Sequence, residues 1–288
     1  MIEMIASIFG TIIRVIYNIT QDNYALSIIL FTLITKALLF PIYLKQIKSN
    51  EEINKIKPKY DEIMKKYKND KVKQSEEATK LYSEHKINPL GGCLPLLIQF
   101  PLILGMFYIV RQPLTYIIEM PKDEIKVYTQ QLLKKEEVSD AEMSNSEIII
   151  ANENKIIDMN FLGLNLGDIP YTAFLGGAEK KANPISVIIP ILSVIFAIYQ
   201  IKQMQKSSQM TEEQMEMQKS MNMMIPMLSG FVAFTTPLAL GIYWLLGTVC
   251  QILQQIITPK LIKLHEEKKE VSLLLSSNKG GKSNEKNN

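Results

Sequence analysis

The apolar residues of this chain are concentrated in four blocks, each close to or above the length of a membrane-spanning helix. The first block, Tyr24–Leu44, reads YALSIILFTLITKALLFPIYL and is too apolar on every face for a helix of a soluble protein. A bilayer core needs about 20 apolar residues per helix. An overall content of 47% hydrophobic residues would also suit a soluble protein, so it is the clustering of these residues into blocks that indicates a membrane protein. The other blocks are Leu94–Ile118, Pro184–Ile201 and Met221–Thr258.

The last block is too long for one span. As a single helix, Met221–Thr258 would extend about 57 Å, whereas the hydrocarbon core is about 30 Å thick. Pro237 lies near its middle, and proline removes a backbone donor and disfavours helix at the residue before it. We therefore expect a turn there and an all-α membrane protein with five transmembrane helices.

The charges between the blocks predict the orientation, because Lys and Arg are retained on the cytoplasmic side. The segment Lys45–Asn88 has 12 Lys and 8 acidic residues, whereas Glu119–Asn183 has 7 Lys and 12 acidic residues. The tail Pro259–Asn288 has 7 Lys and 4 acidic residues. The first and last of these segments are expected in the cytoplasm, which places the N-terminus outside and the C-terminus inside.

The segments outside the spans have their own patterns. The first 20 residues lack the basic start and cleavage site of a signal peptide, and their apolar residues recur at helical spacing. We expect an amphipathic helix on the outer surface, with an additional span as the alternative. Apolar residues at helical steps on both sides of Asn69-Asp70 predict a cytoplasmic helical hairpin, although a charged stretch can also be a plain solvated face.

Two stretches lack a clear periodicity of apolar residues. Glu136–Asn154, in the acidic outer loop, is rich in Ser, Glu and Asn and is expected to be flexible, whereas Asn160–Leu164 can dock on the membrane surface. The chain beyond Leu275 is polar and low in complexity, which predicts disorder. The expected order is an external amphipathic helix (1–22), first span (23–45), cytoplasmic helical hairpin (46–88), second span (89–118), external loop (119–183), third span (184–202), cytoplasmic Met-rich loop (203–220), fourth span (221–236), fifth span (237–258) and cytoplasmic basic tail (259–288).

Lys36 is the unusual residue of the first span. It precedes Lys45 by nine residues, so its backbone lies about 13 Å inside a core whose boundary is near Lys45. A lysine stem reaches only part of that distance. An intramembrane charge costs about 3 kcal/mol and normally faces a cavity. A structural lysine that snorkels or is paired inside the protein is the alternative.

Polar side chains form a stripe on each of three spans. Thr32, Thr35 and Lys36 share one face of the first span. One stripe alone could join helices, but three that face one another would line a wet groove. The residues predicted to line it are Lys36, Thr32, Thr35, Gln200, Ser193, Trp244, Thr248 and Gln251.

The remaining residues favour binding over catalysis. A methionine cluster from Met204 to Met227 is suited to varied apolar segments, although some of its members are ordinary membrane residues. His85 and His265 have no ligand-spaced partner, and the two cysteines supply no disulfide framework. There is no GxxxxGK[ST] phosphate loop. We therefore expect no enzyme activity, no metal and no cofactor.

Several segments together resemble the YidC family of membrane protein insertases, which are related to the mitochondrial Oxa and chloroplast Albino proteins. The carriers are TKALLFPIYLKQIKS, KPKYDEIMKKYKND, NPLGGCLPLLIQFP, PISVIIPILSVIFAIYQIKQM and MNMMIPMLSGFVAFTTPLALGIYWLLGTVCQILQQ. The resemblance implies a five-span core with a hydrophilic groove open to the cytoplasm and the lipid and closed on the outside. Many members have arginine where this chain has Lys36, and Gln200 and Trp244 match groove-lining positions.

The function implied by the resemblance is insertion and folding of integral membrane proteins. Its partners would be nascent membrane proteins and the lipid bilayer, with the Sec translocon and the ribosome as further candidates and no small-molecule substrate. Two other classes stay open. A secondary transporter could use Lys36 to bind an anion or move protons, although the five unequal spans show no evident repeat. A scaffold could recruit partners through the cytoplasmic hairpin.

Overall fold

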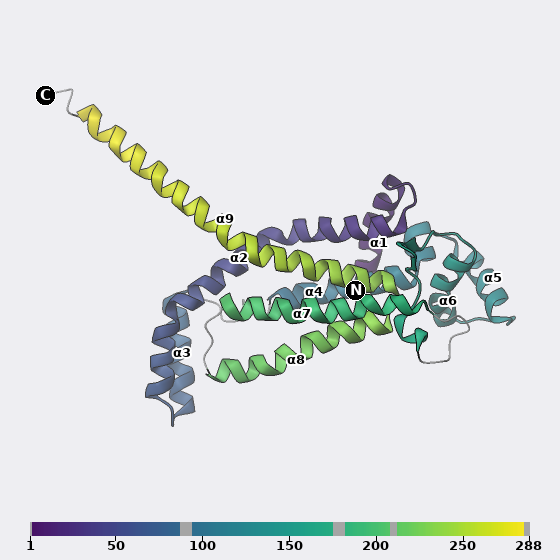
Figure 1. The fold of residues 1–288 in the computed structure, drawn as a ribbon, viewed down its shortest axis with the longest axis horizontal. Helices are drawn as coiled ribbons and strands as arrows, with labels where there is room; N and C mark the ends of the chain where they lie inside the picture. The colour runs from purple at the N-terminus through teal and green to yellow at the C-terminus, as the bar shows by residue number, and fades with distance from the viewer. Residues whose placement is uncertain (1, 87–93, 175–181, 208–211, 285–288) are drawn as a thin grey trace.

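The computed structural model describes residues 2–86, 94–174, 182–207 and 212–284. Its long helices run between two ends of an elongated bundle, with α3 at one end and α5 and α6 at the other (Figure 1). Three helices in this described part are long and apolar enough to cross a membrane, and α4 and α8 contain shorter apolar stretches. In chain order the helices are α1 (Ile2–Ile19), α2 (Tyr24–Lys66), α3 (Lys71–Glu84), α4 (Leu94–Arg111), π-helix η2 (Leu114–Ile118), α5 (Lys122–Leu133), α6 (Asp140–Glu153), 3-10 helices η3 (Pro170–Ala173) and η4 (Pro184–Val187), α7 (Ile188–Ser207), α8 (Glu212–Thr235) and α9 (Leu238–Asn284).

The bundle is built from neighbouring helix pairs. Helix α7 packs against α8 and α9, α2 packs against α9, and α1 packs against α4. Helices α8 and α9 are separate, with the break at Pro237 that the sequence predicts. Proline cannot donate the hydrogen bond that would continue α8. A single chain segment thereby supplies two antiparallel members of the bundle, as Figure 1 shows.

Helix α2 continues past the expected end of the first span. Its N-terminus is capped by Asn23, whose side chain accepts from the Leu26 amide at 2.9 Å. It then runs for 43 residues, and its far part packs against α3 through Ile56 and Leu81. The rings of Tyr60 and Tyr82 lie 5.8 Å apart beside this contact. The α2–α3 pair therefore extends from the first span without a helix break.

The main core lies where α1, α2, α4 and α9 meet. Phe31 of α2 is completely buried, with its ring 5.6 Å from that of Phe9 in α1. Helix α1 crosses α4 closely, because a Cβ on Gly105 would lie only 2.7 Å from the Phe9 ring. The outer faces of α1 remain apolar and exposed at Met4 and Ile19. Helix α1 is thus held to the bundle by one face and leaves another uncovered.

The structure corrects two expectations of flexibility. The stretch predicted to be flexible, Glu136–Asn154, contains helix α6, which starts with a capping box of Ser139 and Glu142 and buries Ile148 and Ile150. Helix α9 continues to Asn284, beyond the point at which disorder was expected. Extending an existing helix does not require the unfavourable step of helix nucleation, so a polar sequence can continue the helix.

The expected Met-rich loop, 203–220, is largely helical. Helix α7 ends at Ser207 and α8 begins at Glu212, so helix covers most of this segment. Residues 208–211, including Met210, lie outside the described residues. Methionine is a strong helix former, which explains why the segment need not leave the helical state.

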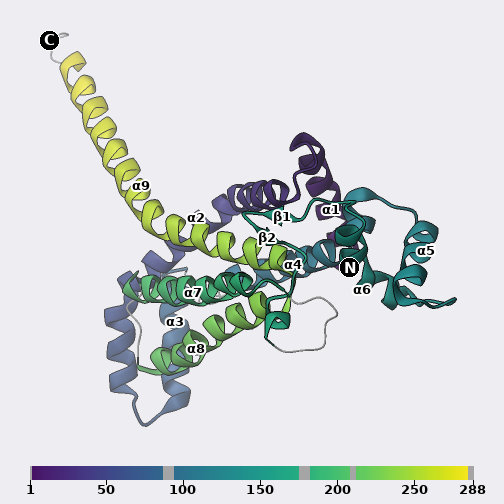
Figure 2. The same ribbon diagram turned by 45° about the vertical axis from the view of Figure 1, so that its right-hand side comes forward.

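The segment between α4 and α7 forms a cap over one end of the bundle, described for residues 119–174 and 182–183. Its two short strands, β1 (Asn160–Phe161) and β2 (Leu164–Asn165), form an antiparallel pair that lies near the ends of α2 and α9 (Figure 2). The Leu238 and Ala239 amides at the start of α9 donate to loop carbonyls at 2.8 and 2.9 Å. These amides have no partner within the helix, so the cap satisfies donors that the helix leaves free.

Candidate functional site

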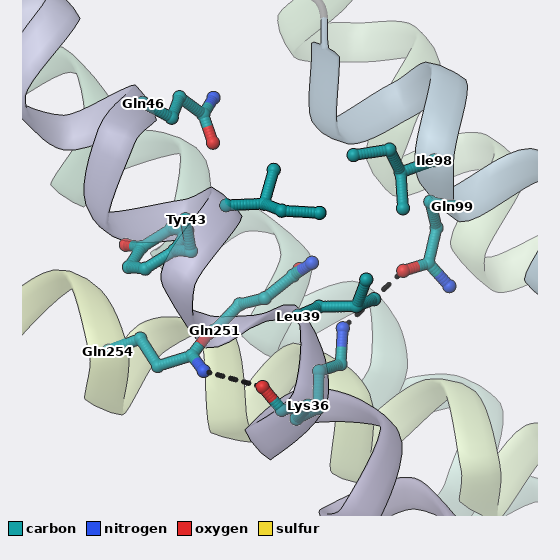
Figure 3. Close-up of a pocket in the computed structure, with 9 residues that line it drawn as sticks. Lys36, Leu39, Tyr43, Gln46, Ile98, Gln99, Gln251 and Gln254 are labelled. Atoms are coloured by element: carbon teal, nitrogen blue, oxygen red, sulfur yellow. Dashed lines mark hydrogen bonds between the residues drawn. The ribbon is translucent and has the colours of Figure 1, made fainter.

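An open pocket lies between α2, α4 and α9. Its residues come from all three helices, as Figure 3 shows. The nine lining residues are Lys36, Leu39, Ile42, Tyr43, Gln46, Ile98, Gln99, Gln251 and Gln254. Their side chains combine one cation with neutral amides, one phenol and aliphatic groups, so the pocket is polar in part without being acidic.

The pocket begins where the packed core ends. Phe31 of α2 and Tyr243 of α9 are buried, with ring centroids 6.5 Å apart. Lys36 and Gly247 follow them by five and four residues, a little over one helical turn along each helix. Both helices start at the cap and run toward the α3 end, as Figure 1 shows. Aromatic packing therefore closes the cap side of Lys36, and the pocket occupies the other side.

Lys36 is almost completely enclosed, with 9% of its surface exposed. Its Nζ atom donates to Oε1 of Gln99 on α4 at 3.4 Å, a long hydrogen bond (Figure 3). The ion pairs found among the described residues do not include Lys36. A buried charge with one weak partner is poorly compensated, so the site favours an anionic group that could approach from the pocket.

Gly247 leaves the room that the Lys36 side chain uses. A Cβ at this position of α9 would lie 3.3 Å from Cε and 3.6 Å from Nζ of Lys36. Glycine is unfavourable in a helix interior by about 1 kcal/mol relative to alanine. The close approach of the lysine stem gives a physical reason for glycine here.

Glutamine amides form the rest of the polar lining. Gln251 accepts from Nε2 of Gln200 on α7 at 2.8 Å, and Gln254 donates to the Lys36 carbonyl at 3.5 Å (Figure 3). Pro41, one turn after Lys36, lacks the amide that would bond to the turn before it, which loosens α2 at this level. Amides can donate and accept, so they can accompany varied polar groups without fixing a single ligand.

The arrangement is suited to binding. No group of three His, Cys, Asp or Glu side chains able to hold a metal occurs in the parts of the chain that the structure describes. Among the described residues that line the pocket, Tyr43 contributes the one hydroxyl group, and none contributes a carboxylate or a histidine. Its chemistry is therefore attraction of negative charge together with contact to apolar groups through Leu39 and Ile42.

The structure brings together three of the eight residues that the sequence placed in a groove. Lys36 and Gln251 line the pocket, and Gln200 adjoins it through its bond to Gln251. Thr32 and Thr35 are buried and donate to carbonyls of their own helix at 2.7 and 2.9 Å.

The remaining three predicted residues also lie outside this lining. Ser193 donates to the Ile189 carbonyl at 2.8 Å, and Thr248 donates to the Trp244 carbonyl at 3.0 Å. Hydroxyl groups can be satisfied by the helix that carries them, so a hydroxyl stripe does not require water. Trp244 itself is half-buried, one turn before Thr248.

Sequence reasoning missed two residues that touch Lys36. Gln99 stands alone among apolar residues in LPLLIQFPLILG, and this isolation was a usable signal. Gln254 lies in the run QILQQ, from which the predicted groove lining included only Gln251. Gln255 carries a buried oxygen without a hydrogen-bond partner among the described residues. Helical spacing alone did not distinguish which of the three amides faces α2.

A comparison with protein families covers the whole of this site. The family model described as 60Kd inner membrane protein matches residues 15–267, which include every residue that lines the pocket. The chain belongs to the 60Kd inner membrane protein family. The family description and the apolar helices agree on an inner membrane protein.

Curated relatives from three organisms carry the name membrane protein insertase YidC. The Oceanobacillus iheyensis protein is 28% identical over 251 residues, which cover 84% of this chain and 77% of that protein. The Clostridium tetani protein is 28% identical over 254 residues, covering 88% of this chain and 90% of that protein. The Geobacter metallireducens protein is longer: its 28% identity extends over 85% of this chain but 35% of its own length. The resemblance therefore involves most of this chain in each pair.

Proposed function

We propose that this protein is a membrane protein insertase that receives hydrophobic segments of nascent membrane proteins at the Lys36 pocket. The observation that carries the proposal is an enclosed lysine at the edge of an open pocket, whose hydrogen bond to Gln99 is the single weak one that it makes among the described residues. The names of the relatives in the family support the same activity.

The topology that we propose has five spans, formed by α2, α4, α7, α8 and α9. The charge balance of the segments favours an external N-terminus and a cytoplasmic C-terminus. In support, the basic α2–α3 pair and the acidic cap lie at opposite ends of the bundle (Figure 1). In this arrangement the pocket lies on the cytoplasmic side of the aromatic core, and α1 lies at the outer surface.

The proposed mechanism begins when a hydrophobic segment with an acidic or polar flank enters the pocket from the cytoplasm. A carboxylate about 4 Å from Lys36 would gain about 4 kcal/mol at an effective dielectric constant of 20. This gain is comparable with the cost of about 3 kcal/mol of holding the lone charge, so the attraction is transient. The apolar segment then moves into lipid, driven by about 25 cal/mol per Å² of buried apolar surface, and no nucleotide is consumed.

Substitutions at Lys36 test this proposal. In proteoliposomes, Lys36→Arg should insert acidic-flanked single-span clients about as well as the parent, Lys36→Ala less, and Lys36→Glu least, because attraction becomes repulsion. Insertion is normalised to folded protein, and a client without acidic flanks should respond less. Lys45→Glu is the matched control, since Lys45 is exposed on the same helix and does not line the pocket.

Two outcomes would contradict the proposal. Equal insertion of acidic-flanked clients by Lys36→Glu and by the parent would remove the electrostatic step. Solute flux through the same proteoliposomes without client insertion would replace the insertase with a transporter.

A further inference from the structure

The turn between β1 and β2 holds a leucine in an unfavourable conformation. Phe161 pairs with Leu164, so Leu162 and Gly163 form a two-residue turn. Their φ angles are +50° and +80°. Such turns favour Asn-Gly or Asp-Gly, because a side chain such as leucine is strained at positive φ. Leu162 is therefore not explained by the conformation of the turn.

Packing within the chain does not explain Leu162 either. Its side chain is 88% exposed, more than any other large apolar side chain among the residues described. Other leucines of the same segment behave differently, because Leu164 and Leu166 are buried. The tip thus presents one apolar group away from the protein, at a position where an exposed asparagine would suit the backbone better.

The base of the hairpin is attached to two of the proposed spans. Asp158 forms a bridge with Asn23, the N-cap residue of α2. On the other side, the Leu166 carbonyl accepts from the Ala239 amide in the first turn of α9 at 2.9 Å. Figure 2 accordingly shows β1 and β2 beside the ends of both helices. If α2 and α9 cross the bilayer, the hairpin lies at its outer boundary.

The composition of the hairpin suits that boundary. The segment 160–167 reads NFLGLNLG and contains no charged residue, although the cap as a whole is acidic. Entry of this tip into lipid would therefore desolvate no charge. Other large apolar side chains are exposed near the starts of the neighbouring spans, including Leu26 in the first turn of α2 and Ile185 just before α7.

We propose that the Leu162–Gly163 turn inserts its leucine into the outer leaflet of the bilayer and anchors the cap to the membrane surface. The exposed leucine contacts lipid, in the glycerol and upper acyl-chain region of the bilayer. The anchor keeps the cap seated on the starts of α2 and α9, the two helices that position Lys36 and Gly247. The proposal rests on the proposed membrane topology and is independent of how Lys36 treats clients.

Tryptophan fluorescence in lipid nanodiscs tests the depth of the turn. Trp244 is the one tryptophan of the chain, so Leu162→Trp is placed in a Trp244→Phe background of the full-length protein. We expect blue-shifted emission that is quenched most by lipids brominated high on the acyl chain. The matched control is Val127→Trp on α5 in the same background, because Val127 is half exposed on the cap away from the hairpin. Equal quenching and equally red-shifted emission at the two positions would overturn the proposal.

A second variant avoids adding an anchoring side chain. Leu162→Asn suits the turn but removes the apolar group, so in nanodiscs it should speed amide hydrogen exchange in residues 158–166 by about tenfold, from loss of leucine burial. Slower or unchanged exchange would mean that the conformation of the turn alone determines the stability of the hairpin. This result would also overturn the proposal of a membrane anchor. Client insertion is measured on the parent and on Leu162→Asn, which both retain Trp244. Lipid-buried emission at position 162 together with no client insertion by the parent would count against the proposed function, whereas normal insertion by the parent with water-exposed emission at position 162 would count against the anchor alone.

Discussion

A substitution at Gly247 should change the stability of α9 and the position of the Lys36 ammonium group in different ways. In Gly247→Ala, the new Cβ would lie 3.6 Å from Nζ of Lys36, an ordinary contact, but 3.3 Å from Cε, which is closer than most carbon contacts. The lysine stem is flexible, so it should move aside. Movement would break the 3.4 Å hydrogen bond between Lys36 and Gln99.

Gly247→Ala has two opposing effects, because it weakens the positioning of Lys36 and stabilises α9. Hydrogen bonds to charged groups contribute about 1.5–3 kcal/mol, and this long one belongs at or below the low end. A loss of about 1 kcal/mol in the positioning of Lys36 corresponds to about a fivefold fall in insertion of acidic-flanked clients. Alanine also stabilises a helix interior by about 1 kcal/mol relative to glycine. Gly247→Ala should therefore insert less while its unfolding temperature stays the same or rises.

The assay is client insertion in proteoliposomes, normalised to folded protein, together with thermal unfolding of the same preparations. Gly241→Ala is the control in α9, because a Cβ there would approach Ile189 of α7 instead of Lys36. In a Lys36→Ala background the effect of Gly247→Ala should disappear, since the group that it displaces is gone. If Gly247→Ala inserts acidic-flanked clients as well as the parent, or has the same effect without Lys36, the reasoning is refuted.

Two further predictions concern the cap and the pocket. Glu147 accepts from the amide and hydroxyl of Thr115 in η2 at 2.8 and 2.6 Å, and burial raises the pKa of this carboxyl above its ordinary value of 4.5. The Glu147 carboxyl therefore contributes its full stabilisation of the cap when the pH is below its ordinary pKa. This stabilisation is lost as the pH rises through the raised pKa. Hydrogen exchange at Thr115, corrected for intrinsic rates, should slow on acidification in the parent but not in Glu147→Gln; equal pH dependence would refute this. In a background without Cys93 and Cys250, Gln254→Cys should react with a water-soluble thiol reagent and Thr32→Cys should not, because Thr32 is fully buried; equal labelling would contradict the pocket as described.

The sequence contained the information for the helical membrane architecture. Span-length apolar blocks are a local property of the chain, because every segment in lipid must satisfy its backbone within a helix. The break at Pro237 follows from the missing amide of proline, and the enclosed position of Lys36 follows from its distance to the end of its block. These features depend on neighbours within the sequence, so no tertiary information was required.

The structure of the cap could not be predicted from local sequence patterns. Helix α6 has no clear amphipathic period, and the chain folds it by combining a Ser139–Glu142 capping box with buried isoleucines and the buried Glu147. A capping box is visible in the sequence, but the burial of Glu147 depends on η2, which lies 32 residues earlier in the chain at Thr115. A composition rich in Ser, Glu and Asn therefore indicated flexibility where long-range contacts impose a helix.

Which polar side chains meet in the pocket depends on how the helices pack against one another. Helical spacing put Thr32 and Lys36 on one face, but Thr32 bonds to its own helix while Lys36 reaches Gln99 on α4. Likewise, Gln254 rather than Gln255 faces α2, because a rotation of α9 by one residue, about 100°, changes the residue that it presents. The rotation of each helix is set by side-chain packing against its neighbours, as at Phe31 and Tyr243. That packing is a property of several distant segments at once, and no single span contains it.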